Sequence, residues 1–230
     1  MPELMAGIRA LGFDLDGTLI DTAPDLTDAI NTMLEVIGQR PLTEACIRRL
    51  IGKGVEHLVL RSLTASLGHE PSNAAYLANA LAQFRATYGQ HFFRRSQVYP
   101  GALIALQSLT QAAMPLCCVT NKESTLALPL LEAAGIGRYL AFTLCPEQPP
   151  ERKPSPTLLL AACARLCVKP HEMLYVGDSV IDIRAARAAG CRVAAVNYGY
   201  DDAHFDAKAD AVIGSLTELV ITSTASARVT

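Results

Sequence analysis

The sequence predicts an α/β fold in which a doubly wound parallel sheet is interrupted by an all-helical insertion. After residue 96, short and nearly continuous apolar runs alternate with helical patterns. Such runs suit strands covered on both faces, and their alternation with helices is typical of a parallel sheet wound on both sides, the Rossmann-like arrangement. Between residues 22 and 95 the pattern is helical throughout, which predicts a separate group of helices placed after the first strand.

The strands of the predicted sheet begin with the run IRALGF at residues 8–13, whose β-branched and aromatic residues favour a buried strand. Five further runs are predicted as strands, at residues 115–120, 139–144, 173–178, 192–196 and 210–214. Helices are expected between them, at residues 123–134, 156–167 and 179–189. Gly135 and Gly190 directly follow two of these helical patterns, and glycine is a common helix stop in that position.

The insertion is expected to form a helical domain at residues 22–95, which leaves residues 1–21 and 96–230 for the α/β core. Thr22 precedes the first helical pattern, and a threonine in this position can accept a hydrogen bond from the first turn of the helix. The later helical patterns of the insertion lie near residues 43–50, 54–67 and 73–92.

The composition is that of an ordinary globular protein. The chain has 230 residues, of which half are apolar and 18% are charged, and its net charge is −2. This charge gives no field suited to nucleic acid or to an anionic membrane. The seven cysteines form no CxxC pair and fit buried thiols in a reducing compartment. With no signal-peptide pattern at the N-terminus, we expect a cytoplasmic protein, monomer or homodimer, that binds neither nucleic acid nor membrane.

Polar side chains follow four of the predicted strands, at the point where each strand ends. Because the carboxyl ends of parallel strands open onto one crevice, we expect these side chains to lie close together. They are Asp14 and Asp16 after the first strand, Thr120 and Asn121 after the second, Lys153 after the third and Asp178 after the fourth. With Asp182 included, four carboxylates then face one ammonium group, and this imbalance calls for a divalent cation.

Magnesium suits such a site, because it is a hard ion that prefers carboxylate oxygens and shares its remaining positions with water and substrate phosphate. A threonine hydroxyl, a backbone N–H near Asn121 and a lysine can all bind phosphate oxygens. Together these groups predict phosphoryl transfer. An ionised aspartate can act as the nucleophile and form an aspartyl phosphate, while Asp16 gives a proton to the leaving oxygen and later takes one from water.

Four motifs of the chain resemble those of the haloacid dehalogenase superfamily of phosphohydrolases. They are FDLDGTLIDT, VTNK, RKPSP and GDSVIDI, in that order, and the helical insertion is similar to the superfamily's cap between its first and second motifs. The stretches IGKGVEHLVLRSL and AAGCRVAAVNYGY resemble bacterial phosphoglycolate phosphatases in particular. The resemblance implies a Mg²⁺-dependent phosphatase that hydrolyses a small phosphomonoester, with 2-phosphoglycolate as the expected substrate.

The resemblance also implies roles for individual residues. Asp14 becomes the nucleophile and Asp16 the general acid and base, while Thr120 and Lys153 become phosphate ligands. The Mg²⁺ ion would be held by Asp14, Asp178 and the backbone carbonyl of Asp16.

Two residues keep two interpretations each. Asp182 could contact the metal, or it could pair with Ser179 in a capping box at the start of its helix. Lys53 stands between Gly52 and Gly54 in the insertion, where it could reach a carboxylate of the substrate or remain an ordinary solvated lysine.

Other functions compete with the phosphatase. A phosphosugar mutase of the same superfamily would return the phosphoryl group to a sugar instead of to water. Dehalogenases and phosphonate hydrolases of the superfamily lack an acid at the position of Asp16, which disfavours them. A phospho-accepting signalling domain also combines acids, a threonine and a lysine, but its two acids are adjacent, so the spacing of Asp14 and Asp16 argues against it.

Overall fold

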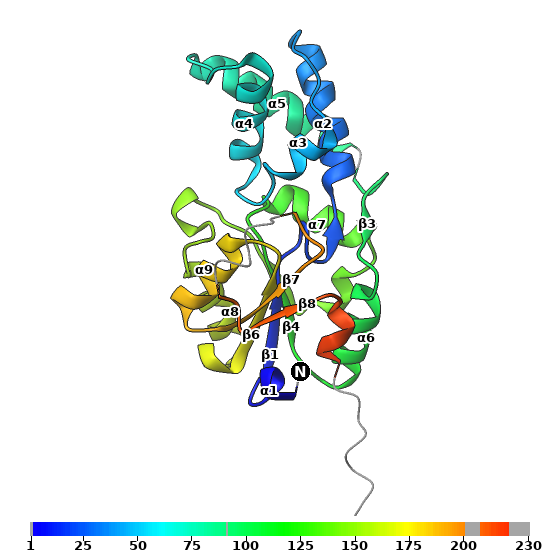
Figure 1. Cartoon of the computed structure of the whole chain (residues 1–230), viewed down its shortest axis with the longest axis vertical. Coiled ribbons are helices and arrows are strands. Elements are labelled where there is room, and N and C mark those ends of the chain that lie inside the picture. The colour runs from blue at the N-terminus through cyan, green and yellow to red at the C-terminus, as the bar shows by residue number, and fades with distance from the viewer. Residues whose placement is uncertain (1, 91, 201–207, 221–230) are drawn as a thin grey trace, which may run out of the picture.

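The computed structural model describes residues 2–90, 92–200 and 208–220 and contains the predicted parallel sheet (Figure 1). Its six strands lie in the order β5-β4-β1-β6-β7-β8, and every neighbouring pair is parallel. They are β1 (Ala10–Phe13), β4 (Leu116–Val119), β5 (Phe142–Leu144), β6 (Met173–Gly177), β7 (Arg192–Val196) and β8 (Ala211–Ile213). Each lies within one of the predicted runs, so the predicted fold class is confirmed.

Strand β1 lies between β4 and β6, at the place where the strand order changes direction. The chain passes from β1 to β4 and β5 on one side, and then crosses to β6, β7 and β8 on the other. In open α/β sheets, ligands bind outside the carboxyl ends of the strands at such a switch point. The residues that follow β1 therefore emerge where the fold favours a ligand.

The two faces of the sheet are covered by helices α6 (Ala102–Gln111), α7 (Ser124–Ala133), α8 (Thr157–Arg165) and α9 (Val180–Ala189). Helices α6 and α7 share one buried apolar cluster with the strands, and α8 and α9 share another. In β6, Leu174 and Val176 belong to the first cluster and Met173 and Tyr175 to the second, as expected of a strand covered on both faces. Within the part of the chain that the structure describes, no helix has both the length and the apolar content needed to cross a membrane.

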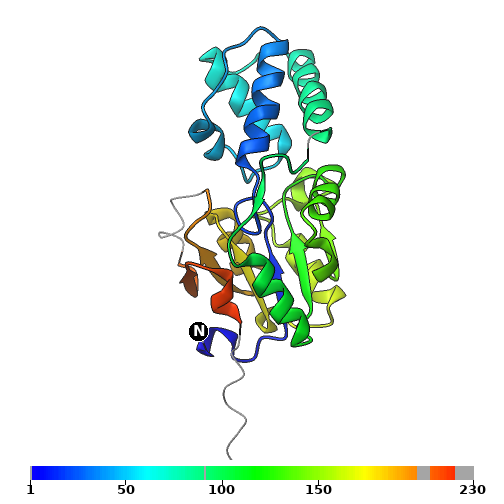
Figure 2. The same ribbon diagram turned by 90° about the vertical axis from the view of Figure 1, so that its right-hand side faces the viewer.

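The insertion consists of α2 (Ala23–Val36), α3 (Glu44–Arg48), α4 (Val55–Leu67) and α5 (Ala74–Gly89). Figure 2 shows these helices as a group at one end of the molecule, beyond the carboxyl ends of the strands. They pack around an apolar cluster that includes Ile30, Leu63 and Phe84 and also Leu126 of α7.

Thr22 stands directly before α2, as predicted, but the expected cap is wrong. Its side chain makes no capping hydrogen bond to α2. Instead, the Thr22 Oγ1 donates to Asp16 Oδ1 over 2.6 Å. The hydroxyl thus serves as a donor to a charged acceptor, and the first N–H group of α2, that of Ala23, is bound by the Tyr200 hydroxyl.

Two short antiparallel strands connect the sheet to the insertion, although the sequence pattern predicts none there. They are β2 (Ile20–Asp21) and β3 (Gln97–Val98). Beside them, the buried Asp25 carboxylate accepts hydrogen bonds from the backbone N–H groups of residues 94–96 and from the hydroxyl of Ser96. The segments that enter and leave the insertion are thereby held side by side.

Candidate active site

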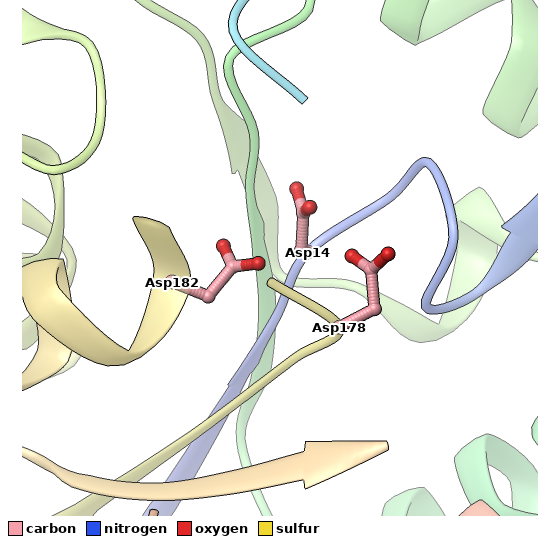
Figure 3. Close-up of side chains that lie close together, drawn as sticks. All are labelled: Asp14, Asp178 and Asp182. Atoms are coloured by element: carbon pink, nitrogen blue, oxygen red, sulfur yellow. The ribbon is translucent and has the colours of Figure 1, made fainter. Parts of the chain in front are cut away.

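The carboxyl ends of β1 and β6 bring three aspartates together (Figure 3). Asp14 directly follows β1, Asp178 directly follows β6, and Asp182 comes from α9. The backbone N–H of Asp14 donates to the Val176 carbonyl over 2.8 Å, which ties the two strand ends to each other. All three carboxylates are buried, and one oxygen of each lies within 4.8 Å of the others. The structure thus brings the two predicted metal ligands, Asp14 and Asp178, together with Asp182, for which the sequence allows two roles.

Burial and repulsion from neighbouring carboxylates disfavour the charged forms of Asp14 and Asp178. Loss of water raises the pKa of Asp14 to about 7; the charge of Lys153 opposes this rise, and those of Asp182 and Asp16 add to it. Burial, with repulsion from Asp182 and Asp14, holds the pKa of Asp178 well above its ordinary range. A divalent cation between the carboxylates would reverse this balance.

The space around the Asp178 carboxylate suits a bound ion. A Cβ at Gly17 or at Gly199 would collide with this carboxylate, so neither position has room for a side chain. Gly17 also has a φ of +86°, a conformation that favours glycine. Buried carboxylate oxygens at this spacing are a donor set that fits Mg²⁺. The other predicted ligand, the backbone carbonyl of Asp16, stays a prediction.

Lys153 supplies positive charge to the cluster. Its Nζ lies 2.7 Å from Asp14 Oδ1 and 2.7 Å from Asp182 Oδ1, and its side chain is 2% exposed. It also donates to the carbonyl of Val119 and to the hydroxyl of Tyr175. Burial opposes the charge, but Asp14 and Asp182 outweigh it and raise the pKa of Lys153 above its ordinary value. A protonated amine therefore lies against the predicted nucleophile, where it can bind an incoming phosphate.

Thr120 and Asn121, which follow β4, have different surroundings. The Asn121 side chain donates to the carbonyls of Gly52 and Lys153 and accepts from the N–H of Lys153. This amide joins the insertion to the Lys153 loop, which leaves the backbone N–H as the group predicted to bind phosphate. Thr120 is buried and lines the cavity over Asp14, and its Oγ1 accepts a hydrogen bond from the N–H of Lys122. Accepting that bond leaves the hydroxyl proton as a donor to a ligand.

Asp16 is held by two donors, Thr22 and Lys122, and Lys122 is not among the predicted site residues. Lys122 Nζ lies 3.0 Å from Asp16 Oδ1, which also accepts from Thr22, and 3.2 Å from Oδ2. Lys122 is buried and lies over the ring of Tyr88, 4.8 Å from its centre. Burial opposes its charge, but Asp16 and Tyr88 raise the pKa of Lys122 above its ordinary value. Its membership of the VTNK motif is the signal that could have revealed it.

The contacts of Asp182 match the capping box predicted as one of its two roles. Its Oδ2 accepts from the N–H and the hydroxyl of Ser179, and the Ser179 hydroxyl accepts in turn from the Asp182 N–H. Its Oδ1 accepts from Lys153 Nζ. Both oxygens of Asp182 are thus bound to protein groups, so it supports Lys153 and the start of α9.

Among the residues that the structure describes, a cavity and a groove adjoin the carboxylates. A small cavity of about 30 Å³ lies over Asp14 and Asp16, and Leu26, Ile51 and Leu58 of the insertion line its other side. The cavity thus has a charged side, which carries the two aspartates, and an apolar side, which the insertion provides.

A groove of about 430 Å³ is the larger hollow. Asp178 and Tyr200 line it from the sheet, and Arg49 and Lys53 line it from the insertion. Lys53 is exposed, and it belongs to this outer groove and not to the cavity over Asp14. From there it could meet the part of a substrate that lies beyond the phosphate.

Residues 12–196 match the family of haloacid dehalogenase-like hydrolases. The chain belongs to this family. The match includes the whole insertion and all four motifs, so the predicted superfamily and the prediction of a hydrolase are confirmed. Membership of this hydrolase family also argues against a phospho-accepting signalling domain.

This haloacid dehalogenase-like hydrolase resembles named phosphatases along most of its length. It is 42% identical to a phosphoglycolate phosphatase of Nitrosospira multiformis, over 92% of this chain and 93% of that protein. A phosphoglycolate phosphatase of Thiobacillus denitrificans is 39% identical, over 93% of this chain and 95% of that protein. Among solved structures, a predicted phosphoglycolate phosphatase from Haemophilus somnus has a TM-score of 0.86 and 30% identity, with 93% of this chain and 96% of that chain covered.

Proposed function

We propose that this chain is a Mg²⁺-dependent phosphatase whose substrate is a small phosphomonoester, 2-phosphoglycolate. The observation that carries the proposal is the buried cluster at the end of β1, where Asp14 Oδ1 lies 2.7 Å from Lys153 Nζ and beside Asp178. The choice of substrate is supported by the relatives named phosphoglycolate phosphatase, at 42% and 39% identity. A cytoplasmic location, and the choice between monomer and homodimer, stay predictions.

In the first step, a carboxylate oxygen of Asp14 attacks phosphorus, and the bond between phosphorus and the ester oxygen breaks. Lys153 and Thr120 bind the phosphoryl oxygens, and Asp16 gives its proton to the departing oxygen. The products are an aspartyl phosphate and, from 2-phosphoglycolate, glycolate. When bound, Mg²⁺ would be held by Asp14, Asp178 and the Asp16 carbonyl and would offset the negative charge that the nucleophile and the phosphate bring together.

In the second step, water attacks the phosphorus of the aspartyl phosphate while Asp16 takes a proton from it. The bond between phosphorus and the Asp14 oxygen breaks, which releases inorganic phosphate and restores both aspartates. Asp14 is only 5% exposed, and the apolar side chains of Leu26, Ile51 and Leu58 lie over it, so the insertion limits the access of bulk water during the first step.

Purified protein with Mg²⁺ is expected to release inorganic phosphate from 2-phosphoglycolate faster than from other small phosphomonoesters. EDTA should abolish this release. Added Mg²⁺ should raise the temperature of thermal unfolding, because the ion relieves repulsion among carboxylates only in the folded state. A colorimetric phosphate assay over a panel of metabolites makes the measurement. If no member of the panel releases phosphate, the proposal fails, and conversion of a sugar phosphate to its isomer would instead identify a mutase.

Lys53→Ala is expected to raise KM for 2-phosphoglycolate about tenfold, the effect of losing one charge-assisted contact worth about 1.5 kcal/mol. KM for p-nitrophenyl phosphate, which has no carboxylate, should change less than about twofold. Steady-state kinetics on both substrates test this, with Lys169→Ala as a matched control because Lys169 is also exposed. Equal changes for the two substrates would show that Lys53 does not bind the carboxylate.

A further inference from the structure

We propose that Tyr200 is a positioning residue for proton transfer: its hydroxyl fixes Thr22, and Thr22 in turn holds Asp16 in place for the leaving group. This inference goes beyond the proposed function and rests on one part of it, the role of Asp16 as general acid. It involves two residues, Tyr200 and Thr22, that have no role in the sequence-based account of the chemistry.

The Tyr200 hydroxyl lies within hydrogen-bond distance of four groups where the chain enters the insertion, the farthest of which is the Thr22 Oγ1, at 3.4 Å. Its oxygen accepts from the backbone N–H groups of Thr22, over 2.6 Å, and Ala23, over 3.0 Å. Its proton is donated to Asp21 Oδ1 over 2.8 Å. The first N–H groups of a helix have no partner within the helix, and the Thr22 side chain provides none here. The phenol oxygen accepts from these N–H groups instead, and it thereby fixes the backbone at the start of α2.

Thr22 transmits this constraint to Asp16. Thr22 is fully buried, and its Oγ1 donates to Asp16 Oδ1, the oxygen that also lies 3.0 Å from Lys122 Nζ. A threonine side chain turns about a single stiff torsion, so a fixed backbone also fixes its hydroxyl. Movement of the Thr22 backbone would therefore turn the Asp16 carboxylate relative to the leaving oxygen.

The rest of Tyr200 is held by contacts that do not use the hydroxyl. Its backbone N–H donates to Asp178 Oδ2 over 2.8 Å. The guanidinium of Arg48 lies over the ring, 5.3 Å from its centre, and Gly17 lies against the ring edge. Phenylalanine can keep all of these contacts, so Tyr200→Phe isolates the effect of the hydroxyl.

A general acid matters most when the leaving group is strongly basic. Phenolate needs a proton on departure far more than p-nitrophenolate, which is stable as an anion. Phenyl phosphate and p-nitrophenyl phosphate are of similar size, and neither has a carboxylate for the insertion to bind. A misplaced Asp16 should therefore slow phosphoryl transfer from phenyl phosphate more than from p-nitrophenyl phosphate. The ratio kcat/KM measures this first transfer and leaves out the later hydrolysis of the aspartyl phosphate.

The experiment compares Tyr200→Phe with the wild-type protein and with Tyr198→Phe, whose hydroxyl donates to the Thr18 carbonyl. Tyr200→Phe is expected to lower kcat/KM about tenfold for phenyl phosphate and less than about twofold for p-nitrophenyl phosphate. Tyr198→Phe should keep the wild-type ratio between the two substrates. Equal losses on both substrates in Tyr200→Phe, or no loss on either, would overturn the proposal.

Thr22→Val provides a second variant, because valine keeps the shape of threonine without its hydroxyl. It is expected to shift the same ratio, and the double variant should shift it no further, since Tyr200 acts through Thr22. If the effects of Thr22→Val and Tyr200→Phe on this ratio were additive, Tyr200 would not act through Thr22.

Amide hydrogen exchange supplies a readout that does not depend on turnover. The N–H groups of Thr22 and Ala23 should exchange faster in Tyr200→Phe than in the wild-type protein or in Tyr198→Phe. Unchanged exchange overturns the role of Tyr200 whatever the activity. A wild-type protein that hydrolyses no phosphomonoester would instead refute the proposed function, and the two failures are thereby distinguished.

Discussion

Replacement of Asp14 by asparagine is expected to lower phosphate release by at least about 1,000-fold while the fold stays intact. A neutral amide oxygen is a far weaker nucleophile than a carboxylate, so the aspartyl phosphate does not form. Asparagine keeps the shape of the side chain and removes a charge from a site where burial raises the pKa of Asp14 to about 7. The metal-free variant should therefore unfold at the same temperature as the wild-type protein, or at a higher one.

Two measurements check this prediction. The first is phosphate release from 2-phosphoglycolate, and the second is the intact mass after a rapid acid quench, where only the wild-type protein should gain a phosphoryl group. Asp28→Asn is the matched control, because the side chain of Asp28 is 54% exposed and lies on the outside of α2. Turnover of Asp14→Asn within about tenfold of the wild-type rate would exclude Asp14 as the nucleophile.

The substitution Lys153→Met should give the largest loss of stability. It is expected to lower the free energy of unfolding of the metal-free protein by about 3–5 kcal/mol, because it leaves buried carboxylates without their cation. Methionine fills much of the same space but removes the charge 2.7 Å from both Asp14 and Asp182. Loss of a phosphate ligand should also reduce activity by at least about 100-fold.

Urea unfolding with EDTA and with excess Mg²⁺ measures the effect on stability. The difference between variant and wild-type protein should be smaller in Mg²⁺, since the ion then offsets part of the carboxylate charge. Lys169→Met serves as the control because Lys169 is exposed, and it should change stability by less than about 0.5 kcal/mol. A change below about 1 kcal/mol for Lys153→Met, with and without Mg²⁺, would show that the ion pairs contribute no more than surface pairs do.

The sheet can be predicted because its strands are short apolar runs covered on both faces, and such runs are visible without any long-range information. Asp14 and Asp178 directly follow two of these runs, so their convergence depends only on the rule that the ends of parallel strands share one edge. The pairing of β1 with β6, which makes the two aspartates neighbours, is a tertiary property that the runs themselves do not contain.

Other parts of the fold have weaker signals. The strands β2 and β3 have two residues each, too few for a periodic pattern. Helix α6 is also absent from the prediction. Its buried residues Ala102, Ala105, Leu106 and Leu109 do have a helical spacing, but the turn residues Pro100 and Gly101 directly before them suggest a loop.

The surroundings of Asp16 show the same limit within the site. The sequence identifies Asp16 from its spacing to Asp14, but Thr22, Lys122 and Tyr200 reach it, directly or through one another, only in the folded chain. The local pattern predicts that the Thr22 hydroxyl caps its helix, but in the folded chain this hydroxyl donates to Asp16, and the Tyr200 hydroxyl binds the N–H of Ala23. Local rules fail at this position because Tyr200, which binds the N–H of Ala23, is far from it in the sequence.

The paired strands β2 and β3 lie where the chain enters and leaves the insertion. Because Asp25 holds both connecting segments together, helices of another length or composition could replace α2 to α5 there without altering the spacing of the aspartates on the sheet. Changes confined to the insertion could then alter which compounds reach the site while the aspartates on the sheet keep their places.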